Sequence, residues 1–230
     1  MAACKRTSHW GIGLLAISLT LTGCSTLDTG GRQIADTLPK VSCKTTLQPE
    51  HQLHLDAVDS LMSRSQPYAA LARLESEELA TEQHWLRQGQ LLASTNQIAG
   101  AEDIFHALSA SCDSAMAYHG LGLVYLKRSR LGEGVNQLRR AREMEPSSAD
   151  VRNDFGYALL LSGEYYDAVF ELRTALELAG GEGAVRQNLA ASYIITGDRA
   201  GLAMLRDQYD LSMNELAHAE KLANSIRSKK

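Results

Sequence analysis

The sequence predicts an all-α protein in which pairs of antiparallel helices repeat along the chain and stack into a superhelix, an α-solenoid. Hydrophobic residues make up 44% of the 230 residues but aromatic residues only 6%. There is little of the apolar and polar alternation that is typical of strands. A pattern of large and small residues recurs with a period of 34, the separation of Gly122 from Gly156 and of Leu138 from Leu172. Such repeats bury their apolar faces by stacking, and about four pairs with a capping helix are expected.

The clearest copies of this pattern lie between residues 115 and 182. The first copy reads Leu121-Gly122-x-x-Tyr125, then Gly134-x-x-x-Leu138 and Ala141, and the second reads Phe155-Gly156-x-x-Leu159, then Ala168-x-x-x-Leu172 and Ala175. A small residue lets two helices approach closely, and a large residue fills the space beside it. The period and this order of sizes are the signature of the tetratricopeptide repeat.

The same pattern extends in both directions and divides the chain from residue 51 to residue 230. We expect a helical hairpin at 51–81, repeats at about 82–114, 115–148 and 149–182, a degenerate repeat at 183–210 and a capping helix at 211–226. The fourth repeat is degenerate because Arg206 stands where the pattern calls for a residue like Leu172. The last segment has apolar residues on one stripe and polar residues elsewhere, as expected of a helix that closes a solenoid.

The first residues have the features of a secretory signal. Lys5 and Arg6 precede an uncharged run from Trp10 to Leu21, which is too short to span a bilayer permanently. The run ends in Leu21-Thr22-Gly23-Cys24, which resembles the lipobox of bacterial lipoproteins. That resemblance implies a signal peptide at 1–23, a lipid on Cys24 and, from the serine that follows it, sorting to the outer membrane. An ordinary cleaved signal with a coincidental cysteine is the alternative.

Residues 24–50 are rich in Thr, Ser, Gly and Pro, and they predict a flexible tether between the lipid and the repeats. Cys43 lies in this tether, and Cys112 lies at the end of the first full repeat. An oxidising periplasm would permit a disulfide between them. A buried Cys112 with a free Cys43 is an equally good interpretation.

No catalytic, metal or cofactor motif is present in the sequence, and we expect an interaction protein that is not an enzyme. The formal net charge of −4 becomes −6 when Lys5 and Arg6 are removed with the signal, which disfavours nucleic acid as a partner. The closest pair of histidines, His51 and His54, has no nearby carboxylate ligand except Asp56 and is expected on a solvated face. Binding of protein partners therefore remains as the function class.

In tetratricopeptide arrays the first helices of successive units line a groove. The register predicts the groove positions His119, Leu123, Leu126, Asn153, Tyr157, Leu160, Gln187, Ala191 and Ile194. This stripe is mostly apolar, lacks the basic cluster of a carboxylate clamp, and suits an amphipathic helix or an extended apolar peptide. Packing between repeats is the alternative for Leu126, Leu160 and Ile194.

The combination of lipobox, tether and repeats resembles the TadD lipoproteins of the Flp, or tight adherence, pilus system. The segment from Val151 to Leu159 and its looser copy from Val185 to Ala190 carry the likeness, together with Cys24. The resemblance implies a lipid anchor in the outer membrane, a periplasmic repeat domain, and a pilotin-like or scaffold role with proteins of the pilus machine, including a secretin. A general envelope scaffold that regulates peptidoglycan or protease complexes remains the alternative function.

Overall fold

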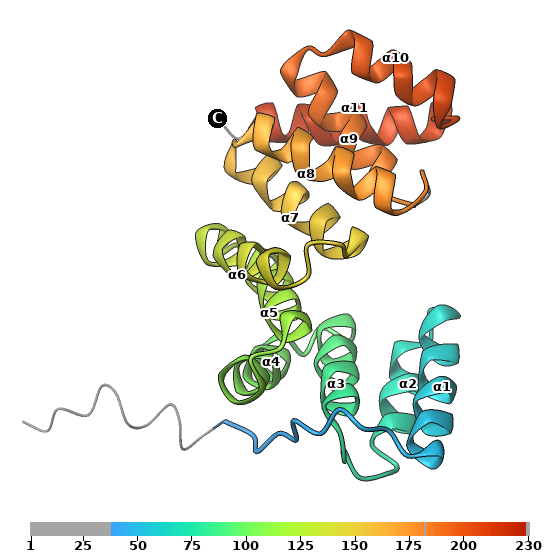
Figure 1. The fold of residues 1–230 in the computed structure, drawn as a ribbon, viewed down its shortest axis with the longest axis vertical. Coiled ribbons are helices and arrows are strands. Elements are labelled where there is room, and N and C mark those ends of the chain that lie inside the picture. Colours follow the sequence, from blue (N-terminus) through green and yellow to red (C-terminus); the bar gives the residue numbers. More distant parts are fainter. Residues whose placement is uncertain (1–37, 182, 229–230) are drawn as a thin grey trace, which may run out of the picture. The chain divides into compact units, whose positions relative to one another are not determined.

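A computed structural model describes residues 38–181 and 183–228, which form eleven α-helices and contain no strand (Figure 1). The predicted all-α fold is therefore confirmed. The signal peptide, Cys24 and the tether as far as residue 37 lie outside the described residues. In chain order the helices are α1 (Pro49–Ser63), α2 (Pro67–Leu74), α3 (Glu82–Ser94), α4 (Ile98–Cys112), α5 (Ala115–Lys127), α6 (Leu131–Met144), α7 (Ala149–Ser162), α8 (Tyr165–Leu178), α9 (Val185–Thr196), α10 (Arg199–Gln208) and α11 (Met213–Arg227).

The helices pack as antiparallel pairs, each of which also contacts the next pair along the chain (Figure 1). The small residues of the repeated pattern allow the close approach within a pair. A Cβ atom added to Gly122 would lie 2.6 Å from Cγ of Leu138, and one added to Gly156 would lie 2.6 Å from Cγ of Leu172. Both leucines are fully buried, so each fills the space that its glycine leaves.

The turn inside each pair uses one residue in the left-handed region of the backbone. Its φ is positive at Ser65, Asn96, Ser129, Gly163 and Gly197. The last three are each 34 residues apart, so the turn repeats with the same period as the core. Gly163 and Gly197 adopt this conformation without the steric cost that a Cβ brings, whereas the serines and Asn96 carry that cost.

In the α9–α10 pair, the buried residues of α10 lie one position earlier in the sequence than the repeat pattern predicts. Leu205 is fully buried in the core, while Arg206 is exposed. Gly201 faces the buried Tyr193, whose ring lies 2.6 Å from the place of a Cβ at Gly201. Tyr193 stands where the two preceding pairs have Tyr125 and Leu159, and its ring meets Gly201, one position before the residue that corresponds to Ala168.

The last helix, α11, packs against α9 and covers the end of the core. Ser212 and Glu215 form a capping box at its start. The carboxylate of Glu215 also pairs with the guanidinium of Arg186 on α9 at 2.8 Å. The hydroxyl and the backbone amide of Ser212 both donate hydrogen bonds to the carboxylate of Glu215. These bonds, with the charge of Arg186, hold the pKa of Glu215 below its ordinary value.

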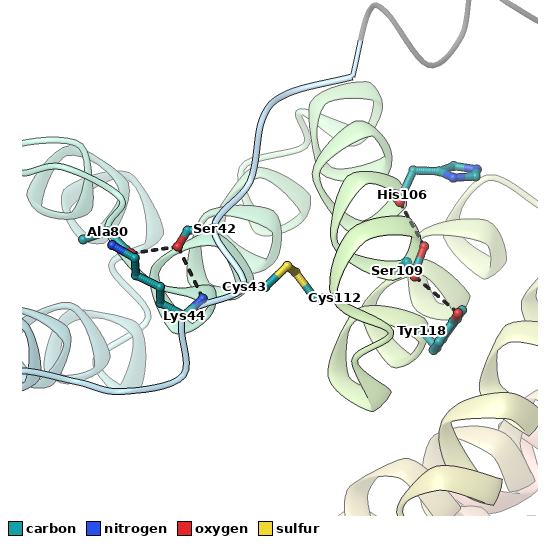
Figure 2. The surroundings of a disulfide bond; sticks show 8 residues. All are labelled: Ser42, Cys43, Lys44, Ala80, His106, Ser109, Cys112 and Tyr118. Carbon is teal, nitrogen blue, oxygen red and sulfur yellow. Dashed lines mark hydrogen bonds between the residues drawn. A yellow bond between two sulfur atoms is a disulfide. The ribbon is translucent and has the colours of Figure 1, made fainter.

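Residues 38–48, which belong to the segment where a tether is expected, form an extended strap before α1. A disulfide joins Cys43 of the strap to Cys112 at the end of α4 (Figure 2). The Ser42 hydroxyl donates to the carbonyl of Ala80 at 2.9 Å, and the amide of Glu82 donates to the carbonyl of Lys44 at 2.9 Å. Three attachments therefore fix the strap to the repeats.

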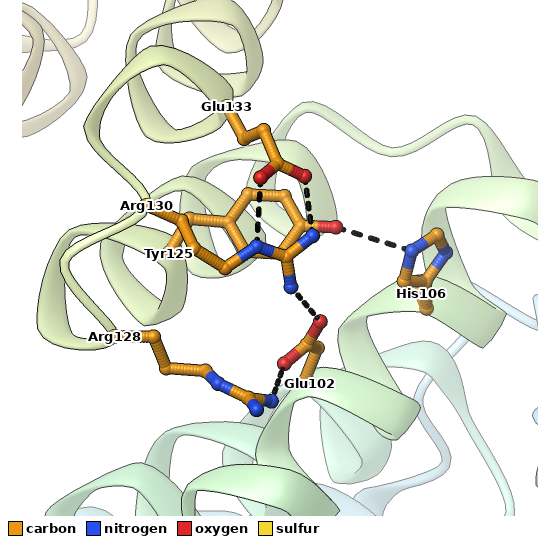
Figure 3. A network of polar contacts seen from close by, with 6 residues as sticks. All are labelled: Glu102, His106, Tyr125, Arg128, Arg130 and Glu133. Carbon is orange, nitrogen blue, oxygen red and sulfur yellow. Dashed lines mark hydrogen bonds and ion pairs between the residues drawn. The ribbon is translucent and has the colours of Figure 1, made fainter.

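A polar network ties the α5–α6 turn to α4 (Figure 3). Glu102 on α4 accepts hydrogen bonds from Arg128 and, at 2.6 Å, from Arg130. The guanidinium of Arg130 also binds Glu133 and lies 4.2 Å above the ring centroid of Tyr125. This network fixes the turn against the preceding repeat and is structural in character.

Candidate functional site

The first helices of the four pairs that follow the α1–α2 hairpin, α3, α5, α7 and α9, contact one another in series. We call the face that they present together the inner face. The predicted groove residues lie on these helices, from His119 on α5 to Ile194 on α9.

A ladder of polar side chains crosses the inner face from α5 to α9. Nε2 of His119 lies 2.7 Å from Oδ2 of Asp154, which is on α7. The amide of Asn153 donates to the other oxygen of Asp154 at 3.1 Å, and its carbonyl oxygen accepts a hydrogen bond from Asn188 on α9 at 2.9 Å. The ladder therefore fixes the spacing of three first helices and places amide and carboxylate groups along the face.

Beside the ladder, between α3 and α5, the inner face is hollowed. The hollow has a volume of about 220 Å³. Its walls are chiefly apolar and include Ala93, Met116, Leu123 and Val124, with His119 and Lys127 among the polar residues. Leu123 is 38% exposed, a large value for a leucine in the middle of a helix. A hollow of this size and lining suits a single apolar side chain of a partner.

The polar ladder stops at α5, where the hollow begins. Gly120, Asp154 and Asn188 occupy equivalent places, each 34 residues from the next. Asp154 and Asn188 are members of the ladder, whereas Gly120 has no side chain to contribute. Because His119 belongs to both the ladder and the wall of the hollow, the two features are continuous.

The predicted groove residues do not all reach the surface. Leu160 and Ala191 are fully buried, so neither can contact a partner, and the inclusion of Leu160 in the binding site is corrected. Leu160 packs in the core between repeats, which was the alternative interpretation. Leu123 is exposed, and the side chains of Asn153, Tyr157, Gln187 and Ile194 are partly exposed.

Two members of the ladder, Asp154 and Asn188, were not among the predicted site residues. Helical spacing identifies which residues share a face, but it does not show which side chains meet across two helices. Their common place in the repeat was a usable signal, since each directly precedes the large-small pair of its repeat, as Gly120 does.

A larger hollow of about 380 Å³ lies between α6 and α8, the second helices of their pairs. Its lining includes charges of both signs, and two of these already pair with each other. Arg142 lies 3.2 Å from the buried carboxylate of Glu171, which also accepts a 2.5 Å hydrogen bond from Arg152. This hollow is therefore a less suitable receptor for an apolar segment than the one beside Leu123.

Within the part of the chain that the structure describes, no three His, Cys, Asp or Glu side chains are arranged to hold a metal ion. None of the described helices combines the length and the apolar character needed to cross a membrane. His51 and His54, expected on a solvated face, lie instead against α3, and His54 is buried.

No protein-family model matches the chain. One curated relative, the TPR repeat-containing protein PA4299 of Pseudomonas aeruginosa, is 31% identical over 217 residues, which are 94% of this chain and 84% of that protein. Among solved structures, the thermophilic TPR protein TTC0263 of Thermus thermophilus is similar with a TM-score of 0.61 at 19% identity, over 74% of this chain and 97% of that one.

The structure of YrrB, described as a TPR protein with an unusual peptide-binding site, is similar with a TM-score of 0.53. It is 23% identical, and the match covers 73% of this chain and 90% of that one. The structural likenesses support the fold, and the relative from Pseudomonas aeruginosa supports the family. The chain belongs to the TPR repeat-containing proteins.

Proposed function

We propose that this protein is an interaction scaffold that binds an apolar segment of a protein partner on its inner face. The observation that carries the proposal is the hollow beside Leu123, which adjoins a ladder of amide and carboxylate groups. The hollow receives one apolar side chain of the partner, and exposed groups of the ladder orient the main chain that carries it. Membership of a family of helical-repeat proteins supports an interaction role.

We further propose that the scaffold acts in the assembly of a Flp-type pilus, anchored by a lipid on Cys24 in the outer membrane. The support is the lipobox at Leu21-Thr22-Gly23-Cys24 together with the repeat architecture. The partner in this proposal is the outer-membrane secretin, whose localisation or assembly the scaffold aids.

Anchoring is tested by the variant Cys24→Ala. The parent protein is expected in the outer-membrane fraction, and the variant is expected to be uncleaved or released, because a single cysteine supplies the lipid. A variant that fractionates with the outer membrane as the parent does would contradict the anchor.

The partner is tested by co-purification of the secretin with two matched variants. Leu123→Asp places a charge in the apolar hollow, and Tyr166→Asp makes the same change at a residue of α8 that is 80% exposed and lies outside the inner face. Loss of the secretin with Leu123→Asp alone supports the proposal. Equal recovery with both variants contradicts this surface, and recovery of peptidoglycan or protease complexes in place of the secretin contradicts the pilus role.

A further inference from the structure

Three histidines from two helices meet where α1 lies against the start of α3. The ring of His84 on α3 lies 5.3 Å from the ring of His51 and 5.7 Å from the ring of His54, both of which are on α1. His84 has no exposed surface and His54 is 1% exposed. The cluster therefore joins two helices through imidazole rings, two of which have little access to water.

Several ring nitrogens in this cluster have no hydrogen-bond partner among the described residues. Nδ1 of His84 lies 2.8 Å from the hydroxyl of Thr81. Nδ1 of His51, Nε2 of His54 and Nε2 of His84 are buried and without a partner. Neutral imidazoles tolerate this arrangement far better than charged ones, because a buried ion without a counter-charge is strongly disfavoured.

One carboxylate is paired with a ring of the cluster. Oε1 of Glu77, in the loop after α2, lies 2.8 Å from Nδ1 of His54 and 3.2 Å from the guanidinium of Arg73. The hydrogen bond with His54 holds the pKa of Glu77 below its ordinary value, so this carboxylate is ionised at neutral pH. It can balance one proton on the cluster, and a second proton would have no paired counter-ion among the described residues.

Among the described residues, no carboxylate other than that of Glu77 forms an ion pair with the three histidines. Asp59 on α1 is already paired with Arg87 on α3 at 2.6 Å. Lys40 and Lys44 of the strap line the same hollow as His51 together with Glu78, so these three groups add net positive charge. Additional protons on the histidines would therefore meet net repulsion.

The hairpin of α1 and α2 is the element that this repulsion would move. It packs on α3 through a small apolar cluster that includes Leu55, Val58, Leu74 and Leu91. On the other side of the hairpin, the disulfide at Cys43 holds the chain to α4. The segment between Cys43 and Thr81 can therefore separate from α3 while both of its ends stay attached.

We propose that the histidine cluster is an acid-sensitive latch, which keeps the α1–α2 hairpin on α3 at neutral pH and releases it when the surroundings become acidic. Release uncovers the α3 side of the apolar cluster, including Leu91. The described repeats from α5 onward are not part of the latch.

The direction of the pH dependence follows from His84. Burial and the neighbouring histidines lower the pKa of His84 in the closed state. In the open state the ring returns to an ordinary pKa of about 6.5. Below that pH the open state binds more protons than the closed state, so closure is complete at neutral pH and is lost progressively as the pH falls.

The test is hydrogen exchange of the purified, oxidised full-length chain at pH 7.5, 6.5 and 5.5, corrected for intrinsic exchange rates. Protection of peptides from α1 is expected to fall by up to about tenfold over this range, since one linked proton with an open-state pKa of about 6.5 can contribute no more than that. Peptides from α9 serve as the internal reference and should change little. Constant protection of α1, or an equal loss in α9, would overturn the proposal.

Three variants separate a latch from a general weakening. His84→Phe keeps a ring in the cluster but cannot take a proton, so α1 should exchange with a flat pH profile even if the hairpin is looser at every pH. His218→Phe, at an exposed position of α11, should behave as the parent. Glu77→Gln should deepen the loss at pH 5.5, because the cluster then has no paired carboxylate to balance a proton. A full pH response in His84→Phe, or a shallower one in Glu77→Gln, would contradict the latch.

Discussion

The ring of Phe105 occupies the space that a side chain at Gly120 would need. A Cβ atom at Gly120 would lie 2.3 Å from Cε1 of the ring, and one at Gly89 would lie 2.7 Å from Cζ. The ring, carried by α4, is therefore enclosed between the first helices α3 and α5. It also forms part of the wall of the hollow beside Leu123, so the packing of this phenylalanine shapes the proposed binding site.

We predict that Gly120→Ala destabilises the repeats by about 1–3 kcal/mol, because the enclosed ring of Phe105 cannot move aside. Chemical denaturation followed by circular dichroism measures the change. In a Phe105→Leu background the same substitution should lower the free energy of unfolding by clearly less, since the ring that a Cβ at position 120 would meet is absent. Equal costs in the two backgrounds would show that the ring is not the obstacle.

At equivalent positions of the repeated left-handed turn, opposite substitutions should change the free energy of unfolding in opposite directions. Ser129→Gly should raise the free energy of unfolding by up to about 1 kcal/mol, because glycine removes the steric cost of a positive φ. Gly163→Ser should lower it by a similar amount. Ser225→Gly, at an exposed position within α11, is the control and should be slightly destabilising, as expected of glycine in a helix.

The strap disulfide should stabilise the oxidised protein substantially. Cys43 and Cys112 are 69 residues apart, and the chain-entropy model gives a contribution of up to about 4 kcal/mol for a loop of this length. Addition of a reductant should therefore lower the denaturation midpoint of the parent. The double variant Cys43→Ser and Cys112→Ser should show a low midpoint that reductant does not change. A parent midpoint that is insensitive to reductant would contradict the prediction.

Glu171 is buried between two arginines from different helices and should be sensitive to loss of its charge. It lies on α8 and pairs with Arg142 of α6 and Arg152 of α7. Glu171→Gln leaves both guanidinium groups without a counter-ion and should cost about 2 kcal/mol of stability. The exposed Glu177 on the same helix offers a matched control, since Glu177→Gln should change stability by less than about 0.5 kcal/mol.

The fold was predictable because the size pattern of the repeat is carried by residues close in sequence. Gly122 and Leu138, like Gly156 and Leu172, meet within one helix pair and recur with a period of 34. The shifted register of α10 was not predictable in this way. It depends on how the ring of Tyr193 meets Gly201, which is a matter of tertiary packing.

The candidate site was predictable only in part. Helical spacing placed His119 and Leu123 on one face, and the structure brings both to the hollow. It could not show that Leu160 is covered by the next repeat or that Asp154 pairs with His119. The meeting of His84 with His51 and His54 joins residues from separate helices at irregular spacing, and no local pattern indicates such contacts.

The central claim, that the inner face binds a partner segment through the hollow beside Leu123, has one direct test. A photo-reactive residue at position 123 identifies the bound segment in cells, and the dissociation constant of that segment is then measured for the parent, Leu123→Asp and Tyr166→Asp. We predict at least about a tenfold weaker affinity for Leu123→Asp, equivalent to about 1.4 kcal/mol, and an unchanged affinity for Tyr166→Asp. Unchanged affinity for Leu123→Asp in a folded protein would contradict the account.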